Sequence, residues 1–240
     1  MPNLIANWPA PSTIGALTTT RVGGESQRPY QGNNLGFHVG DDEASVSANR
    51  LALRQSLLLP QEPAWLDQTH SNCCVVVEDD PNRVADAAIT RRKDQPLVIM
   101  TADCLPILLC DRQGTEIAAV HSGWRGLANG IVENTLAKMH SSPGALMAWI
   151  GPAICGKCYE VGDDVWQAYT SQYPFTRDTF KRQGTRWFAD LAKMAELILN
   201  HHGVQAVYQS SACTYELKNK FYSYRREVKT GRIATLIWFK

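Results

Sequence analysis

The stretch VIMTADCLPILLCDRQGTEIAAVHSGWRG (98–126) decides the fold, because buried strands and a strand–turn–helix unit follow one another within it. Residues 97–101 and 105–110 are short apolar runs typical of buried strands, and together they resemble a hairpin-like pair. EIAAVH (116–121) is another such run, and the SGWRG turn leads into a predicted helix over 127–140. Helices that alternate with strands and adjacent strand pairs indicate an α/β or α+β fold with a mixed sheet.

Outward from this stretch, the same patterns predict the remaining elements. Further strands are expected at 14–20, 63–69, 73–78, 146–151, 206–210, 221–225 and 232–240. Further helices are expected over 43–58, with Leu51 and Leu58 on its apolar face, from about 162, and over 190–202, capped by Asp190. Residues 21–42 form a long loop rich in Gly and Asn, and such loops in compact domains are usually functional or disordered. Without repeats or low-complexity tracts, we expect a single domain over 1–240.

Composition places the chain among ordinary globular proteins, with 44% hydrophobic and 20% charged residues. A net charge of +1 gives no reason to expect nucleic acid or an anionic membrane as partner. The N-terminus lacks the pattern of a signal peptide, and the longest apolar run is too short to span a bilayer. Seven cysteines at irregular spacing argue against a disulfide framework. We therefore expect a cytoplasmic protein with mostly free thiols, and a monomer by default.

Three possible soft-metal ligands stand at the ends of strand-like runs: His70, Cys104 and His121. One Cys and two His suit a zinc ion, and three protein ligands leave one position open for water or substrate. Spacings of 34 and 17 residues are too wide for a zinc finger, so three loops would have to converge. Each residue also has a simpler interpretation, as a buried structural cysteine or a satisfied histidine.

Several neighbouring features bear on this site. Gly123 and Gly126 would let the backbone approach a ligand closely, and Arg125 adds a cation beside a helix N-terminus that could bind an anion. CGKC (155–158) is a CxxC pair, but no helix is predicted to begin there, so redox or metal chemistry is the minority interpretation. His140, His201 and His202 lie at helix ends and are interpreted as structural.

A series of motifs spanning nearly the whole chain resembles the YfiH/DUF152 family, whose members carry the names laccase-domain protein, multicopper polyphenol oxidase and purine nucleoside phosphorylase. The motifs are TTTRVGG (18–24), NNLGFHVGDD (33–42), WLDQTH (65–70), TADCLPILLCD (101–111), AAVHSGWRG (118–126), WIGPAI (149–154), YEVGDDV (159–165), CTY (213–215) and FYSYRR (221–226). The CxxC form of CGKC departs from the family pattern.

The resemblance implies a single layered α/β domain, with mixed sheets flanked by helices, similar to the catalytic domain of the cytotoxic necrotizing factor deamidases. It implies a metal site at His70, Cys104 and His121, holding Zn²⁺ or, as the alternative, Cu²⁺. The implied activities are phosphorolysis of adenosine, inosine and methylthioadenosine, with adenosine deamination beside it. A role in peptidoglycan editing has also been proposed for the family.

Zinc gives deamination a physical basis, because it lowers the pKa of a bound water to roughly 7. Ammonia release needs a proton shuttle, and Asp103, next to Cys104, is the candidate acid/base. The alternative for Asp103 is a hydrogen bond that orients His70 or His121.

Phosphorolysis needs phosphate held at the sugar, and arginines suit phosphate because their donor fork is bidentate and permanently charged. Candidates are Arg21, Arg125 and Arg225, each weighed against a surface ion pair. Asn34 and His38, on the long loop, could bind ribose, base or phosphate. Tyr222 and Tyr224 could stack a purine or belong to the core.

Three other functions stay open from sequence. Cys104 could act as a nucleophile with His121 as base in a metal-independent amide hydrolase. Copper at the Cys/His₂ site could oxidise phenols slowly, although six histidines without an HxH pair do not fit a multicopper oxidase. A non-enzymatic binding protein is the third alternative.

Overall fold

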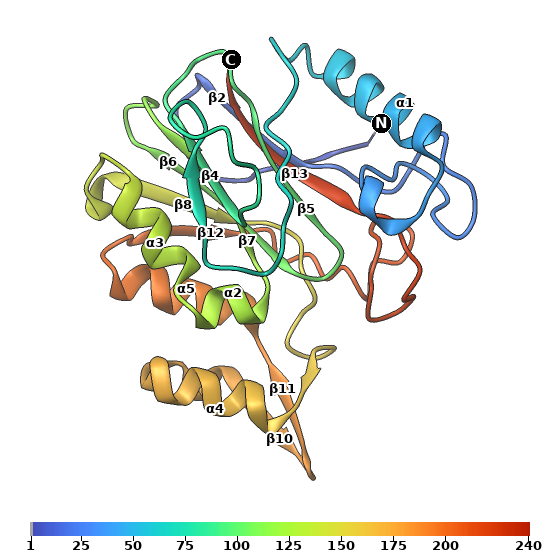
Figure 1. Ribbon diagram of the computed structural model, residues 1–240. Helices are drawn as coiled ribbons and strands as arrows, with labels where there is room; N and C mark the ends of the chain where they lie inside the picture. Colours follow the sequence, from blue (N-terminus) through green and yellow to red (C-terminus); the bar gives the residue numbers. More distant parts are fainter. Residues whose placement is uncertain (1) are drawn as a thin grey trace.

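The computed structural model describes residues 2–240, and its architecture is a mixed α/β fold in layers (Figure 1). The largest sheet has the strand order β12-β8-β6-β7-β4-β3. Its strands are β3 (Cys74–Val76), β4 (Ala87–Thr90), β6 (Leu105–Asp111), β7 (Ile117–Ser122), β8 (Leu146–Ile150) and β12 (Ala206–Gln209). The pairs β3–β4 and β8–β12 are parallel and the other pairs are antiparallel, so the predicted mixed sheet is confirmed.

A second, four-stranded sheet has the order β1-β2-β13-β5 and is antiparallel throughout. Its strands are β1 (Leu4–Ile5), β2 (Ile14–Thr18), β5 (Leu97–Thr101) and β13 (Ile233–Phe239). The chain passes from this sheet to the larger one between β5 and β6. The hairpin-like pair expected at 98–111 is therefore wrong: β5 pairs with β13, and β6 pairs with β7 and β8.

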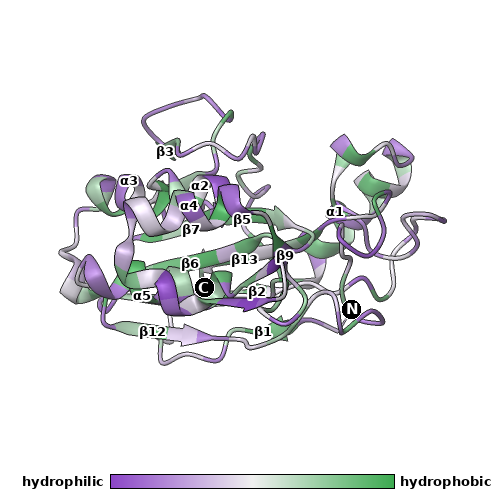
Figure 2. Cartoon of the chain, turned by 90° about the horizontal axis from the view of Figure 1, so that it is seen from below, coloured by the Kyte–Doolittle hydropathy of each residue, from purple (hydrophilic) through white to green (hydrophobic). Residues whose placement is uncertain are grey.

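The two sheets pack face to face, and helices cover their outer faces. Alternate residues of β6 show this arrangement, because Leu108 packs between the sheets while Ile107 faces the helices. Helices α2 (Trp124–Ala128), α3 (Ile131–Lys138) and α5 (Leu191–His201) cover the larger sheet, and α1 (Glu43–Ser56) covers the smaller one. Figure 2 shows hydrophobic strands between helices whose outer faces are hydrophilic.

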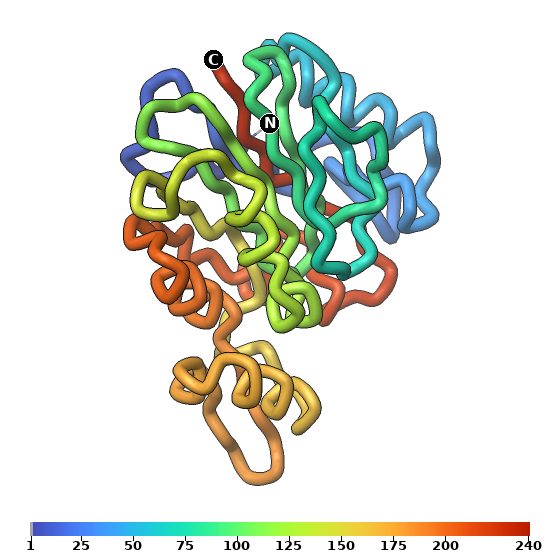
Figure 3. The backbone as a smooth tube through the Cα atoms, turned by 60° about the vertical axis from the view of Figure 1, so that its left-hand side comes forward, coloured from blue at the N-terminus to red at the C-terminus, as the bar shows by residue number. Residues whose placement is uncertain are grey.

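A small lobe extends from these layers (Figure 3). It holds α4 (Asp163–Gln172) and the antiparallel sheet β10-β11-β9, made of β9 (Glu160–Val161), β10 (Phe180–Gln183) and β11 (Arg186–Ala189). Short 3-10 helices lie at Phe37–Val39, Pro143–Ala145 and Pro174–Thr179. Among the described residues, no helix is both long and apolar enough to cross a membrane.

Most predicted elements are present, with four corrections. Residues 63–69 are irregular apart from a bridge at Ala64, and 221–225 are irregular up to a turn that begins at Tyr224. The helix expected over 127–140 is divided into α2 and α3 at Gly130, whose φ is 87°. Leu51 is 53% and Leu58 88% exposed, so neither lies on the buried face of the first helix. Asp190 does cap α5, accepting a hydrogen bond from the Lys193 N–H.

Candidate functional site

Three segments of the larger sheet bring His70, Cys104 and His121 together, here called the metal-ligand triad. His70 lies in the loop before β3, Cys104 in the turn between β5 and β6, and His121 on β7. Because Pro106 of β6 pairs with His121, the start of β6 lies beside the end of β7. The possible ligand atoms of the triad all lie within 4.8 Å of one another, and the Cys104 Sγ is 3.7 Å from the His70 Nε2.

Two residues at this junction have left-handed backbone conformations that non-glycine residues rarely adopt. The φ of His70 is 62° and that of Asp103 is 89°. Such conformations cost on the order of 1–3 kcal/mol each and persist only where surrounding contacts hold them. The hydrogen bonds of two buried carboxylates, Asp86 and Asp103, supply these contacts.

Asp86 is fully buried and connects both histidines of the triad. One oxygen, Oδ1, accepts hydrogen bonds from the His121 Nδ1 at 2.7 Å and the His70 backbone N–H at 3.1 Å. The other accepts from the Thr69 N–H and from both the N–H and the hydroxyl of Ser71. With Nδ1 held by a carboxylate, the His121 Nε2 is left as the ligand atom, an arrangement that is common around metal-binding histidines. Sequence reasoning missed Asp86; a lone acidic residue before the apolar run AAIT was its only signal.

The charges of the site stabilise one another. Burial alone would raise the pKa of the Cys104 thiol, but His121 and His70 outweigh it and lower the pKa to about 6. Burial alone would lower the pKa of His121, but Cys104 and Asp86 outweigh it and raise the pKa to about 9. For Asp86, hydrogen bonds from His121 and Ser71 likewise outweigh burial and lower the pKa to about 2. Without a metal ion, Cys104 and His121 therefore form a thiolate–imidazolium pair at neutral pH.

The donor set fits a metal ion such as zinc, since a thiolate and two imidazole nitrogens are ligands that zinc prefers. Gly123, directly after β7, leaves the space for them. A Cβ added at Gly123 would lie 2.8 Å from the His70 Cδ2 and 3.3 Å from the Cys104 Sγ.

A cavity of about 210 Å³ opens beside the triad. It is bordered by Cys104 itself, by two cations, Arg125 and Arg225, and by aromatic and other side chains. The remaining lining residues are Ala102, Asp103, Trp124, Ile154, Tyr159, Leu191 and Tyr224. Aromatic faces with a few convergent charged groups are typical of small-molecule sites.

Known proteins match this chain over nearly its whole length. The model of the family described as "Multi-copper polyphenol oxidoreductase laccase" matches residues 15–240. The crystal structure of a DUF152 protein from Neisseria meningitidis is 44% identical, with a TM-score of 0.95 over 99% of both chains. The chain belongs to the YfiH/DUF152 family. A Bacillus licheniformis YfiH structure, 30% identical, has a TM-score of 0.87 over 95% of this chain and 93% of that one.

Curated YfiH/DUF152 relatives carry the name purine nucleoside phosphorylase. One from Pseudomonas aeruginosa is 44% identical, covering 99% of this chain and 98% of its own. Another, YfiH of Escherichia coli, is 38% identical, covering 98% of each. These names and the copper-oxidase description of the family differ, so the chemistry has to be argued from the site.

Asp103 lines the cavity of this YfiH/DUF152 protein, but its carboxylate is turned to the wall. It accepts hydrogen bonds from the Thr214 hydroxyl at 2.6 Å, the Ser223 hydroxyl at 2.9 Å and the Arg225 N–H at 2.7 Å. Within residues 2–240 it has no hydrogen bond to either histidine of the triad. The expectation that Asp103 orients those histidines is therefore wrong, because Asp86 does so.

Arg125 and Arg225 both border the cavity, as expected of candidate phosphate ligands. Different contacts hold each of them there. Helix α2 has only five residues, too short for the dipole argument made from the sequence. Arg125 instead lies over the ring of Trp124, 4.3 Å from its centroid. Arg225 donates to the Glu160 carbonyl and lies 5.2 Å from the centroid of Tyr159.

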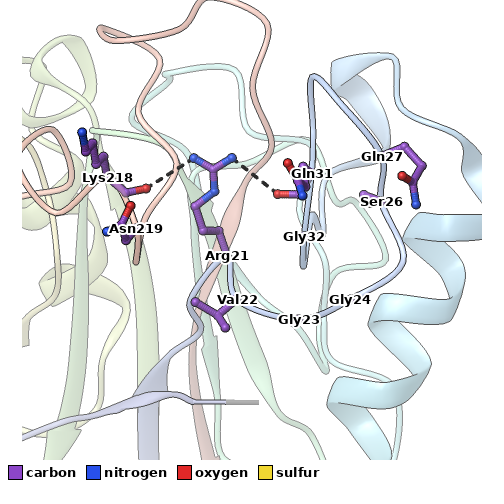
Figure 4. Close-up of a pocket in the computed structure, with 10 residues that line it drawn as sticks. All are labelled: Arg21, Val22, Gly23, Gly24, Ser26, Gln27, Gln31, Gly32, Lys218 and Asn219. Carbon is purple, nitrogen blue, oxygen red and sulfur yellow. Dashed lines mark hydrogen bonds between the residues drawn. The ribbon is translucent and has the colours of Figure 1, made fainter.

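Arg21 lies outside this cavity, in a separate pocket of about 530 Å³ (Figure 4). Its guanidinium donates to the carbonyls of Lys218 and Gln31 and lies over the ring of Tyr222, so it ties loops together. The buried Tyr222 donates its hydroxyl to the carbonyls of Tyr30 and Gln31, so it belongs to the core.

Asn34 and His38 also lie off the cavity wall. Asn34 is fully buried and bonds Asp41 and the Arg232 N–H, which is a structural role. His38 is on the surface, where partial burial and the charges of Arg232 and Arg50 lower its pKa. Sequence reasoning missed Arg232, whose pKa is lowered by burial although the charge of the nearby Cys104 acts in the opposite direction.

Proposed function

We propose that this protein is a purine nucleoside phosphorylase that cleaves adenosine, inosine and methylthioadenosine with phosphate, and that deaminates adenosine as a side activity. One observation carries the proposal: two arginines and three aromatic rings share a cavity with Cys104. The names of the curated relatives support the same class of enzyme.

Arg125 and Arg225 are the proposed phosphate ligands. In the described residues the guanidinium of Arg125 has no hydrogen-bond partner, and that of Arg225 uses only Nη1, on the Glu160 carbonyl. Both therefore keep donors for an anion, and a bidentate guanidinium suits phosphate geometry. Trp124 and Tyr224 offer faces for the purine, and Tyr224 is 51% exposed at the mouth of the cavity.

His70, Cys104 and His121 are the proposed ligands of a zinc ion. Bound zinc supplies a water of lowered pKa, which is what deamination at C6 requires. Asp86 holds the ring of His121 and the loop of His70 in place. Asp103 stays a candidate acid/base because it borders the cavity, although its three hydrogen bonds make it a better positioning residue for Arg225 and Ser223.

A second candidate function is metal-independent amide hydrolysis, including the proposed role in peptidoglycan precursor editing. Cys104, His121 and Asp86 stand in the order nucleophile, base and orienting carboxylate. The lowered pKa of the thiol specifically favours this alternative. It predicts activity that survives chelation and is lost on alkylation. Slow phenol oxidation by copper at the same ligands is the remaining alternative.

The test is adenosine turnover by metal-analysed protein, with and without phosphate, followed by chromatography of the bases. Phosphate-dependent adenine release, lost in His70→Ala and Cys104→Ala, supports phosphorolysis at this site. Inosine formed without phosphate would make deamination the main reaction. If no nucleoside turns over, the proposal fails and amide hydrolysis takes its place.

We expect the protein to act as a monomer in the reducing cytoplasm, in line with its seven free thiols.

A further inference from the structure

Three cysteines that the proposed reaction does not use lie together outside the active-site cavity. Cys155 and Cys158 come from CGKC, and Cys213 comes from a distant segment after β12. Their sulfur atoms all lie within 4.8 Å of one another. This set is called the cysteine cluster below.

The backbone brings the cysteine cluster together from two segments. Ala153 pairs with Cys213 in a parallel β-bridge, which aligns the two segments. The Cys158 N–H then donates to the Cys155 carbonyl at 2.9 Å, closing a turn that places both thiols on one side. The Cys155 N–H donates to the Cys213 Sγ at 3.3 Å. Cys213 is buried and the other two are half-buried, so the cluster is largely shielded from solvent, and its CGKC segment directly precedes β9 of the small lobe.

We propose that the cysteine cluster binds one thiophilic d¹⁰ metal ion, Zn²⁺ or Cu⁺, at a site separate from the metal-ligand triad. Thiolates around zinc lie at about 2.3 Å from the ion, which in a tetrahedron places sulfurs about 3.8 Å apart. The separations in the cluster need only a small closure to reach that value. Binding displaces the thiol protons to solvent, and the metal–sulfur bonds replace the S–H bonds without any change of oxidation state.

The surroundings favour an ion over a redox-active disulfide. A redox CxxC pair of the thioredoxin type stands at the start of a helix, which lowers the pKa of one thiol. Here the segment after Cys158 is strand β9, and a helix begins only at Asp163. A third, buried thiol has no role in a two-cysteine redox pair, whereas it supplies a third ligand to an ion. Cys155 also borders a cavity of about 200 Å³, which gives an ion a route to the cluster.

An ion at this position would hold one wall of the active-site cavity. Ile154 and Tyr159, which flank the CGKC turn, both line that cavity. Thr214, next to Cys213, donates its hydroxyl to Asp103. The two segments that the ion would join therefore carry two residues of the wall and the hydrogen-bond partner of a third, Asp103, and the ion would fix their spacing. Binding at the cluster does not depend on which reaction the enzyme catalyses.

The experiment measures metal content of the whole reduced chain. The protein is loaded separately with Zn²⁺ and with Cu⁺ without oxygen, dialysed and analysed, as wild type and as Cys158→Ser, Cys155→Ser and His70→Ala. With zinc we expect about two ions per chain in wild type and about one in each variant. Cys73→Ser is the control, because Cys73 is exposed and outside both sites, and it should keep both ions.

Cobalt distinguishes the two sites by spectrum. The thiolate-to-cobalt charge-transfer band grows with the number of thiolates, of which the cluster has three and the triad one. His70→Ala should therefore keep most of the band, and Cys158→Ser should lose most of it while staying folded by circular dichroism. If Cys158→Ser and Cys155→Ser both bind as much metal as wild type, the proposal is overturned. A Cys155–Cys158 disulfide that forms in preference to metal binding, seen by alkylation and mass spectrometry, would also overturn it.

Discussion

Asp86 is the residue on which the geometry of the metal-ligand triad depends most. Its two oxygens accept five hydrogen bonds, so both must be acceptors. In Asp86→Asn one oxygen becomes an NH₂ group that faces N–H donors in either orientation. We expect a loss of about 3 kcal/mol in the free energy of unfolding, because buried donors lose their charged partner. Urea unfolding of the metal-free protein measures this loss.

Asp94→Asn is the matched control, since Asp94 forms an exposed pair with Arg92 and should contribute little. The pH dependence gives a second check. Folding lowers the pKa of Asp86 to about 2, so its stabilisation is present above about pH 4 and is lost as the pH falls toward 2. Wild type should therefore lose stability over this window more steeply than Asp86→Asn. Equal stability of the two proteins at pH 7 would contradict the assignment.

Cys104 should be reactive at an unusually low pH in the metal-free protein. The lowered pKa keeps the thiol ionised down to about pH 6, and the thiolate is the form that reacts with iodoacetamide. We expect half-maximal alkylation of Cys104 near that pH, and a shift upward in His121→Ala because the imidazolium partner is lost. Mass spectrometry of the labelled peptide, with Cys73 as internal reference, measures it. An unchanged profile in His121→Ala would show that the two residues are not coupled.

At the scale of secondary-structure elements, the turn between β7 and α2 determines how much room the side chains of the triad have. In Gly123→Ala the new Cβ would lie 2.8 Å from the His70 ring, closer than real contacts allow. We expect the His70 loop to move and zinc affinity to fall by at least about tenfold, since ligand geometry decides affinity. Gly144→Ala is the control, with no atom within 4 Å of the added Cβ. Zinc titration against a chelating dye compares them, and equal affinities would contradict a tight turn.

The sequence predicted elements well where their hydrophobic pattern was local. Strands β6, β7 and β8 and helix α5 follow from apolar runs and from the Asp190 cap. The pairing between strands could not be predicted from local sequence, because β5 and β6 are neighbours in sequence yet belong to different sheets. The buried face of α1 was also misassigned, because Asn49, a polar residue, is buried there to bond loop carbonyls.

The candidate site divides in the same way. The triad was predictable because soft ligands at strand ends stand out in an apolar sequence. Asp86 was not predictable, because its hydrogen bonds to residues 69–71 form only when that loop lies against it in the fold. The placement of Arg21 failed for a related reason: a motif arginine can bind carbonyls of neighbouring loops as readily as phosphate. Residue types indicate which chemistry a site can support. The hydrogen-bond partners of each side chain, by contrast, depend on contacts between segments that are distant in sequence.

At the scale of the molecule, the site lies where the two sheets part. The chain crosses from the smaller to the larger sheet between Thr101 and Leu105, and this crossing places Asp103 and Cys104 at the junction. His70 and His121 reach the same junction from other segments of the chain. An ion bound there would add direct bonds between segments that are otherwise joined by packing and hydrogen bonds, so the stability of the whole layered body should respond to metal.

Chelation should therefore lower the unfolding temperature of the whole protein. An ion present at about one hundred times its Kd stabilises the native state by about 2.7 kcal/mol, or roughly 5–10 °C for a chain of this size. Differential scanning calorimetry with and without chelator measures the shift. In His70→Ala the shift should shrink, because the triad no longer binds, and the unfolding temperature without metal should change little, since His70 is exposed. A shift of equal size in wild type and His70→Ala would mean that the triad does not hold the stabilising ion.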